Sequence, residues 1–134
     1  MAKESGLGMT VAVDDDGGSA RSIENDVTSV QIGTPNNLQD ITGVDKSAIE
    51  RLLLLADGAV SLSGVVNTAA NQQHDVFKSV GVTEVIRTVT IVVSGQTLPM
   101  EMVVQSYNMI RADDGSLGWT ATLALANGTV PTWA

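Results

Sequence analysis

The chain of 134 residues lacks cysteine and long apolar runs, and it has few aromatic and few basic residues. Without cysteine it can form no disulfide, thiolate metal site or thiol nucleophile. Only 7 lysines and arginines stand against 15 acidic residues, so the formal net charge is −8, which argues against a protein that binds nucleic acid phosphates through clustered basic residues. The longest apolar run, residues 52–56, is far shorter than the ~20 residues that span a bilayer, which predicts a soluble protein. Glu4 and the aspartates at 14–16 argue against a secretion signal.

Apolar residues are nevertheless abundant, at 43% of the chain with a positive mean hydropathy, while aromatic residues make up only 3%. A length of 134 residues fits one domain that buries its own core. A small monomer must also cover itself with polar surface, so some of this apolar surface is expected to be covered by partners.

Most of the chain shows the period-two alternation of β-strands. Residues 117–126 alternate between large apolar and small side chains, and residues 7–13 do the same. Residues 98–104 set up a third alternating face whose phase slips near Ser106, after which Tyr107 and Met109 take the inward positions, and this slip predicts a β-bulge or bend. Residues 85–94 are rich in β-branched side chains and predict a further strand.

Turn residues connect these strands into a C-terminal β-meander. The Ser94-Gly95 pair predicts a hairpin between residues 85–94 and the strand that follows. Residues 113–115, Asp-Asp-Gly, tolerate positive φ and predict a second hairpin into the strand from Leu117. The fold class predicted is mainly β, with two packed antiparallel sheets in a sandwich or barrel-like arrangement.

Three segments depart from this pattern. Residues 68–80 have apolar side chains at three-four spacing and predict one flanking helix, capped by Asn67 or Thr68 and ended by a left-handed Gly81. Residues 49–56 fit either a helix or a strand, and we favour a short helical turn followed by a strand. Residues 33–44 have turn residues and no periodicity, which predicts a loop of about a dozen residues with a contact function.

The residues that could carry chemistry are few. His74 is the only histidine and is expected on the exposed helix face, where no serine or carboxylate completes a catalytic triad. Residues 14–18 suggest calcium, but the glycine spacing is wrong and Asn25 stands where a bidentate glutamate is required, so an acidic turn is favoured. Residues 127–129 match a glycosylation sequon and are better explained as a turn. We expect no enzyme, no metal site and no cofactor.

One phrase points to a family. Residues 55–64, Leu-Ala-Asp-Gly-Ala-Val-Ser-Leu-Ser-Gly, resemble the corresponding segment of phage major tail proteins, the subunits of the tail tubes of long-tailed bacteriophages. The resemblance in layout extends over most of residues 7–130, with the helix from Thr68 after the strand that ends at Gly64. The apolar run at 52–55 departs from the family pattern and leaves that strand boundary open.

The resemblance implies a virion protein, assembled in the host cytoplasm, that forms stacked hexameric rings with DNA as a passing, non-specific passenger. Its implied partners are further copies of itself, a tape measure protein inside the tube, and tail terminator and tail tip proteins, with no membrane involved. Residues 1–134 would be one tail tube domain with a flexible arm at 1–6 and a long contact loop at 33–47. Negative channel walls would let DNA slide. The candidates for the acidic lining are Glu24, Asp26 and Glu50, and those for contacts between subunits are Thr34, Asn36, Asn37, Leu38, Asp40 and Trp133.

Two other functions stay open at this stage. The inner tube of a contractile tail or of a type VI secretion-like machine has a similar fold and ring geometry. A monomeric carbohydrate-binding or adhesion β-sandwich also fits the β pattern. The small number of aromatic residues and the expected lack of a secretion signal weigh against it.

Overall fold

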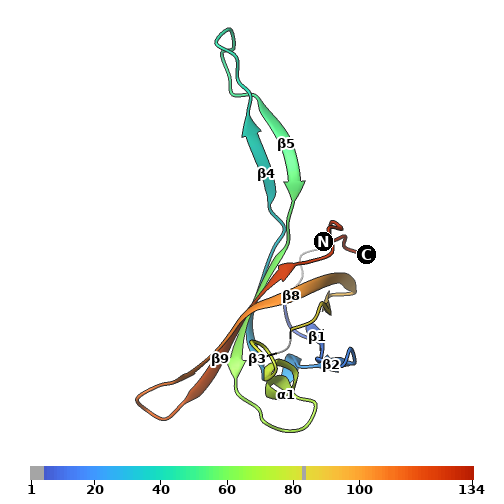
Figure 1. Cartoon of the computed structure of the whole chain (residues 1–134), viewed down its shortest axis with the longest axis vertical. Coiled ribbons are helices and arrows are strands. Elements are labelled where there is room, and N and C mark those ends of the chain that lie inside the picture. Colours follow the sequence, from blue (N-terminus) through green and yellow to red (C-terminus); the bar gives the residue numbers. More distant parts are fainter. Residues whose placement is uncertain (1–4, 83) are drawn as a thin grey trace.

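The computed structural model describes residues 5–82 and 84–134, and strands dominate it (Figure 1). The predicted flexible arm at 1–6 lies mostly outside these residues. Two short helices accompany the strands, the 3-10 helix η1 (Glu24–Asp26) and α1 (Gln73–Phe77). The strands of the described residues are β1 (Thr10–Asp14), β2 (Ala20–Ser22), β3 (Val27–Gly33), β4 (Asn36–Asp40), β5 (Arg51–Ala56), β6 (Ala59–Val65), β7 (Arg87–Val93), β8 (Gln96–Arg111) and β9 (Leu117–Leu125).

Every strand pair is antiparallel. A seven-stranded sheet has the order β2-β1-β7-β8-β9-β6-β3, and a separate two-stranded sheet joins β4 to β5. The larger sheet is open, because its order ends at β2 on one side and at β3 on the other. The predicted fold class is confirmed as mainly β with antiparallel sheets and a short flanking helix.

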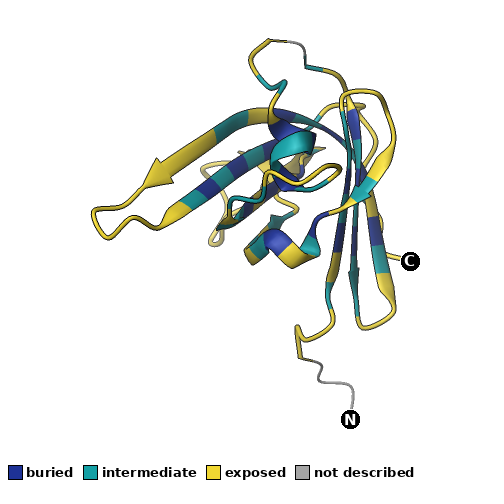
Figure 2. Ribbon diagram, turned by 90° about the horizontal axis from the view of Figure 1, so that it is seen from below, coloured by how far each residue is buried: buried dark blue, intermediate teal, exposed yellow. Residues whose placement is uncertain are grey.

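The 16-residue strand β8 divides the larger sheet into two layers. Residues 96–102 pair with β7, residues 102–111 pair with β9, and the register shifts between Val104 and Ser106, which confirms the predicted bulge. We call β2, β1, β7 and residues 96–102 the β7 layer, and residues 102–111, β9, β6 and β3 the β9 layer. The two packed layers are therefore halves of one bent sheet, and the buried residues concentrate where they meet (Figure 2).

The hydrophobic core lies between the two layers and beneath α1. The Phe77 ring lies 5.5 Å from the ring centroids of both Tyr107 and Trp119. The buried indole N–H of Trp119 donates to the carbonyl oxygen of Val65 at 3.1 Å, which satisfies a polar group that would otherwise be costly to bury. The buried apolar residues come from both layers and from α1: Val11, Val13, Ile23, Val60, Leu62, Val76, Phe77, Val89, Ile91, Leu98, Met100, Met102, Val104, Trp119, Ala121 and Leu123.

The helix is much shorter than the predicted 68–80. The Asn67 side chain accepts a hydrogen bond from the Ala69 N–H at 3.0 Å, and Asn71 takes a positive φ of 62°, so neither residue continues a helix. The helix begins after Gln72, whose side chain makes no capping hydrogen bond. The prediction that Asn67 or Thr68 caps the helix is therefore wrong. Gly81 does adopt the predicted left-handed conformation, at a φ of 91°.

A buried arginine fastens α1 to the β7 layer. Arg87 is fully buried, and its Nη1 donates to the Val76 oxygen at 2.7 Å and to the Asp14 oxygen at 2.9 Å. Its Nε donates to Glu84 at 2.8 Å, so the charge is paired inside the protein. The guanidinium thus joins β1, α1 and β7, and its loss would leave buried hydrogen-bond acceptors and the Glu84 carboxylate without a partner.

Two predictions about residues 33–56 are wrong. Residues 36–40, expected within a loop, form β4, and the helical turn expected at 49–56 is absent because residues 51–56 form β5. Leucine favours helices locally, but pairing between β4 and β5 over a distance in sequence overrides that preference. At the N-terminus, the strand expected from Leu7 starts at Thr10, and Leu7 itself is exposed.

The predicted hairpin turns are confirmed. Ser94 and Gly95 take positive φ between β7 and β8, and Gly115 takes a φ of 91° between β8 and β9. In the part of the chain that the structure describes, no helix has the length and apolar character that crossing a membrane requires.

Candidate assembly surfaces

A two-stranded arm projects from one end of the larger sheet (Figure 1). We call residues 34–57 the arm, which is distinct from the N-terminal segment 1–6. It continues the β3–β6 pair, because only two residues separate β3 from β4 and only two separate β5 from β6. The Asp57 N–H donates to the Pro35 oxygen at 2.9 Å, and this bond holds the two sides of the hairpin together at the junction. The arm therefore extends along the direction of the strands in the β9 layer.

The arm is covered with exposed apolar side chains. Leu38 pairs with Leu53 and Gln39 pairs with Leu52, so leucines occupy both faces of the hairpin. Leu55 is 82% exposed and Leu53 is 65% exposed. An isolated two-stranded hairpin is only marginally stable in water, and a contiguous apolar surface marks an interaction site. The large apolar side chains exposed on the arm are Leu38, Ile41, Val44, Ile49, Leu52, Leu53, Leu54 and Leu55.

Polar groups order the outer part of the arm. The Thr42 hydroxyl donates to the Asp40 carboxylate at 2.6 Å and accepts the Glu50 N–H at 2.8 Å. The bond from the Thr42 hydroxyl, followed by that from the Thr42 N–H, lowers the pKa of the Asp40 carboxyl. The bonds between Thr42 and Glu50 tie the two sides of the hairpin together beyond the last β pair, Asp40 with Arg51.

The β9 layer has two free strand edges. Beyond Met102, β8 pairs with β9 alone, so residues 103–111 have one unpaired edge. On the other side of the layer, β3 pairs with β6 alone. Unpaired strand edges present N–H and C=O groups that pair readily with another chain.

A buried polar cluster anchors α1 to the β9 layer. The Asp26 carboxylate accepts the Asn67 side-chain N–H at 2.9 Å and the Gln73 backbone N–H at 3.3 Å. The Gln73 side chain donates to the Tyr107 hydroxyl at 2.7 Å, and His74 Nδ1 lies 3.0 Å from the same hydroxyl. Burial raises the pKa of Tyr107. His74 is half-buried against this hydroxyl, so its predicted exposure is wrong, and the cluster holds the helix in place.

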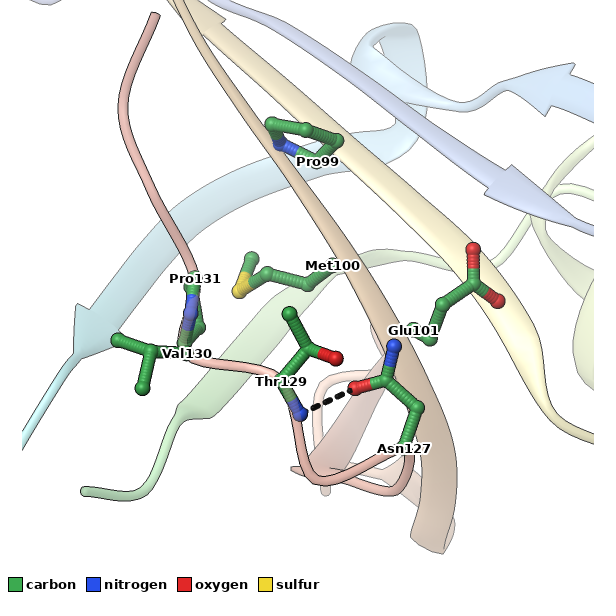
Figure 3. Close-up of a pocket in the computed structure, with 7 residues that line it drawn as sticks. All are labelled: Pro99, Met100, Glu101, Asn127, Thr129, Val130 and Pro131. Atoms are coloured by element: carbon green, nitrogen blue, oxygen red, sulfur yellow. Dashed lines mark hydrogen bonds between the residues drawn. The ribbon is translucent and has the colours of Figure 1, made fainter.

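A small cavity lies near the C-terminus. A cavity of about 160 Å³ lies between β8 and the C-terminal segment, lined by Pro99, Met100 and Glu101 on one side and by Asn127 and residues 129–131 on the other (Figure 3). This volume is below the roughly 300–1,000 Å³ that ligand pockets usually enclose. Two more open hollows, of about 290 Å³ and 310 Å³, adjoin β3. Asn127 is occupied in a turn, where its oxygen accepts the Thr129 N–H at 3.1 Å. Within residues 5–82 and 84–134, no three His, Asp or Glu side chains gather as a metal site would need.

The comparisons with known proteins rest on structure. No protein-family model matches the sequence, and no curated protein matches it. A chain from the tail of an empty gene transfer agent particle, refined with helical and C6 symmetry, matches with a TM-score of 0.75 over 98% of this chain and 99% of the other, at 14% identity. A chain from the virion of a native gene transfer agent particle matches with a TM-score of 0.77 over the same shares, at 12% identity.

The chain has the fold of a gene transfer agent tail protein. The resemblance to phage tail tube proteins that residues 55–64 suggested is thereby confirmed at the level of the fold. The match runs over nearly the whole of both chains, so it includes the arm and both layers of this chain.

The residues predicted to contact other subunits lie mostly together. Five of them are exposed on the first side of the arm, before its tip: Thr34, Asn36, Asn37, Leu38 and Asp40. Their contact role stays a prediction.

The remaining predicted contact residue, Trp133, is 43% exposed near the C-terminus. The adjoining Ala134 exchanges two backbone hydrogen bonds with Thr97, which holds this end of the chain beside β8. The exposed leucines of β5 are not among the predicted contact residues, although their uninterrupted run leaves the strand without a polar face and marks them as candidates.

The three residues predicted to line an acidic channel are not equivalent. Asp26 is only 6% exposed and is occupied inside the subunit, so it cannot face a channel, and this prediction is wrong. Glu24 is half-buried, and its Oε2 atom is buried. Glu50 is exposed, but it lies in the outer part of the arm and away from the β9 layer.

Proposed function

We propose that this chain is the structural subunit of a phage-like tail tube, located in the tail of a virion or virion-like particle, and that it has no enzymatic role. The observation that carries the proposal is the arm, whose exposed leucines on both faces leave the isolated subunit incomplete. The fold shared with proteins of gene transfer agent tails supports it.

The free edges of the β9 layer suggest how subunits join into a ring. Strand direction alternates along β8, β9, β6 and β3, so β3 runs opposite to β8. Rotation about a ring axis preserves the direction of each strand along that axis. The β3 edge of one copy therefore meets residues 103–111 of the next copy in antiparallel orientation, and closure leaves no free edge in this layer.

The arm points toward the next ring. The Ala59 end of β6 adjoins the arm, whereas its Val65 end pairs with Gly118, close to the turn between β8 and β9. Arm and turn therefore lie at opposite ends of the β9 layer. If the strands run roughly along the tube axis, the arm of each subunit reaches the adjacent ring and buries its leucines there.

A sixfold ring gives a channel of useful width. The C6 symmetry belongs to the gene transfer agent tail, and we extend it to this chain as part of the proposal. Six copies would contribute about 24 strands, and at about 4.8 Å per strand the circumference is at least about 115 Å. The channel would pass DNA as a non-specific passenger and hold a tape measure protein before that, with terminator and tip proteins closing the two ends.

Electron microscopy of the purified protein over a concentration series tests the proposal. Hollow tubes, or rings with sixfold averages, should appear as the concentration rises, while sedimentation shows monomer at low concentration. A protein that stays monomeric at every concentration and at low and high salt would refute the tube. Particles from the source that show a sheath around the tube would assign it to a contractile tail.

A further inference from the structure

The outward face of the β9 layer is uncharged. Side chains on this face are identified by register, since those paired across neighbouring strands and alternating with the core residues share one side of the sheet. Ser61 pairs with Thr122, and Ser63 pairs with Thr120, at the centre of the face. The face consists of Ser29, Gln31 and Gly33 from β3, Ala59, Ser61, Ser63 and Val65 from β6, Gly118, Thr120, Thr122 and Ala124 from β9, and Val103, Ser106, Asn108 and Ile110 from β8.

The absence of charge on this face is unusual for an exposed surface. Charged residues make up 16% of the chain, so a face of 15 residues would carry about two of them if they were evenly spread. None of its residues is Asp, Glu, Lys or Arg. The charged residues of the described part of the chain lie elsewhere: on turns, on the arm, on η1 and α1, on the β7 layer and, for Arg111, at the last position of β8. In the β7 layer, Glu101 accepts a hydrogen bond from Thr88 at 2.6 Å.

Steric limits decide which side of the β9 layer faces a channel. Packed sheets lie about 10 Å apart, so moving from one layer to the next changes the radius of a ring by about 10 Å. With the β7 layers inside, a ring of about 115 Å circumference would leave them only about 50 Å. The β7 layers and α1 therefore fit only outside the β9 layer, and the uncharged face turns inward.

We propose that this face lines the channel of the tube, so that the channel wall is a neutral surface of hydroxyl and small side chains and not an acidic one. The inference rests on the proposed tube. A wall without lysine or arginine gives DNA phosphates no site for counterion release, so it cannot hold the polymer. A wall without carboxylates neither attracts nor repels the DNA phosphates, so the polymer moves freely without electrostatic repulsion from the wall. The short side chains of the face also leave the bore wide.

Single cysteines test the position of the face, because the chain contains no cysteine of its own. Ser61→Cys and Thr122→Cys would be treated with a small maleimide and with a maleimide coupled to a carrier protein too large for the bore. In free subunits both reagents should react. In assembled tubes the small reagent should react at a similar rate, while the carrier should react at least tenfold more slowly. Lys78→Cys, at the exposed residue that follows α1, should react with both reagents in tubes.

The outcomes separate this inference from the proposed function. Equal reaction with the carrier in tubes and in free subunits would place the face outside the tube and overturn the inference. Loss of reaction with both reagents in tubes would show the face covered by a protein contact, which also overturns it. Failure of the unmodified chain to form tubes would refute the proposed function itself.

A second measurement tests the neutrality of the wall. Tubes of Thr122→Lys should retain a short fluorescent DNA duplex at low salt and release it as the salt concentration rises, since each ring would gain a circle of ammonium groups. Tubes of the unmodified chain and of Thr122→Ser should retain none. Equal retention by the lysine and serine variants would contradict the placement of Thr122 in the channel.

Discussion

Removing two leucines from the arm should weaken assembly without weakening the subunit. Full burial of a leucine side chain stabilises a contact by about 1.5–3 kcal/mol. Leu53 and Leu55 are 65% and 82% exposed in the subunit, so docking of the arm can bury most of each side chain. Scaled by these fractions, the double substitution Leu53→Ser, Leu55→Ser costs about 2–4 kcal/mol of association per subunit. At about 1.4 kcal/mol per tenfold change, the critical concentration for tubes should rise about 30- to 700-fold.

The assay combines pelleting of tubes over a concentration series with urea unfolding of the free subunit. The unfolding midpoint should change little, because substitutions on exposed surface usually alter stability by less than about 0.5 kcal/mol. Val82→Ser is the matched control, since Val82 is 87% exposed and lies outside the arm. If the double variant pellets at the same concentration as the unmodified chain and this control, the arm does not carry the assembly contact.

Three further predictions concern the subunit alone. Gly64→Ala should lower the unfolding free energy by about 1–3 kcal/mol, because a methyl group there meets the Asp26 backbone oxygen, whereas Gly33→Ala meets open space and should match the unmodified chain in the same urea titration. Arg87→Ala should cost about 3–5 kcal/mol by urea unfolding, and a loss below 1 kcal/mol would contradict the buried clamp. The Ser19 N–H bond is the main cause that lowers the pKa of Asp15, so its stabilisation is present above about pH 4 and is lost on further acidification. Asp15→Asn should therefore lower the thermal midpoint at pH 6 and leave it unchanged near pH 2, as read by circular dichroism.

Local patterns predicted the β-meander well. The alternation through β9 reflects a sheet with one face on a core, and Trp119, Ala121 and Leu123 are buried as the alternation requires. The slip of phase near Ser106 was visible because a bulge exchanges the inward and outward positions of all residues that follow it. Both features are encoded within a few neighbouring residues.

Features that depend on distant residues could not be predicted in this way. The arm forms because β4 pairs with β5, and neither strand has a buried face that would imprint a period on its sequence. Asp26 is a surface residue by type, and it is buried only because Asn67 and Gln73, some 40 residues further along the chain, supply its hydrogen bonds. The neutral face of the β9 layer likewise emerges only once four strands are placed side by side.

The shared strand β8 gives the subunit a mechanical property. Its first part belongs to the β7 layer and its last part carries the free edge that we propose joins the neighbouring copy. No flexible connector separates these two parts, since only a bulge lies between them. A pull exerted on the free edge by a neighbouring copy would therefore be transmitted along the continuous backbone of one strand into the β7 layer.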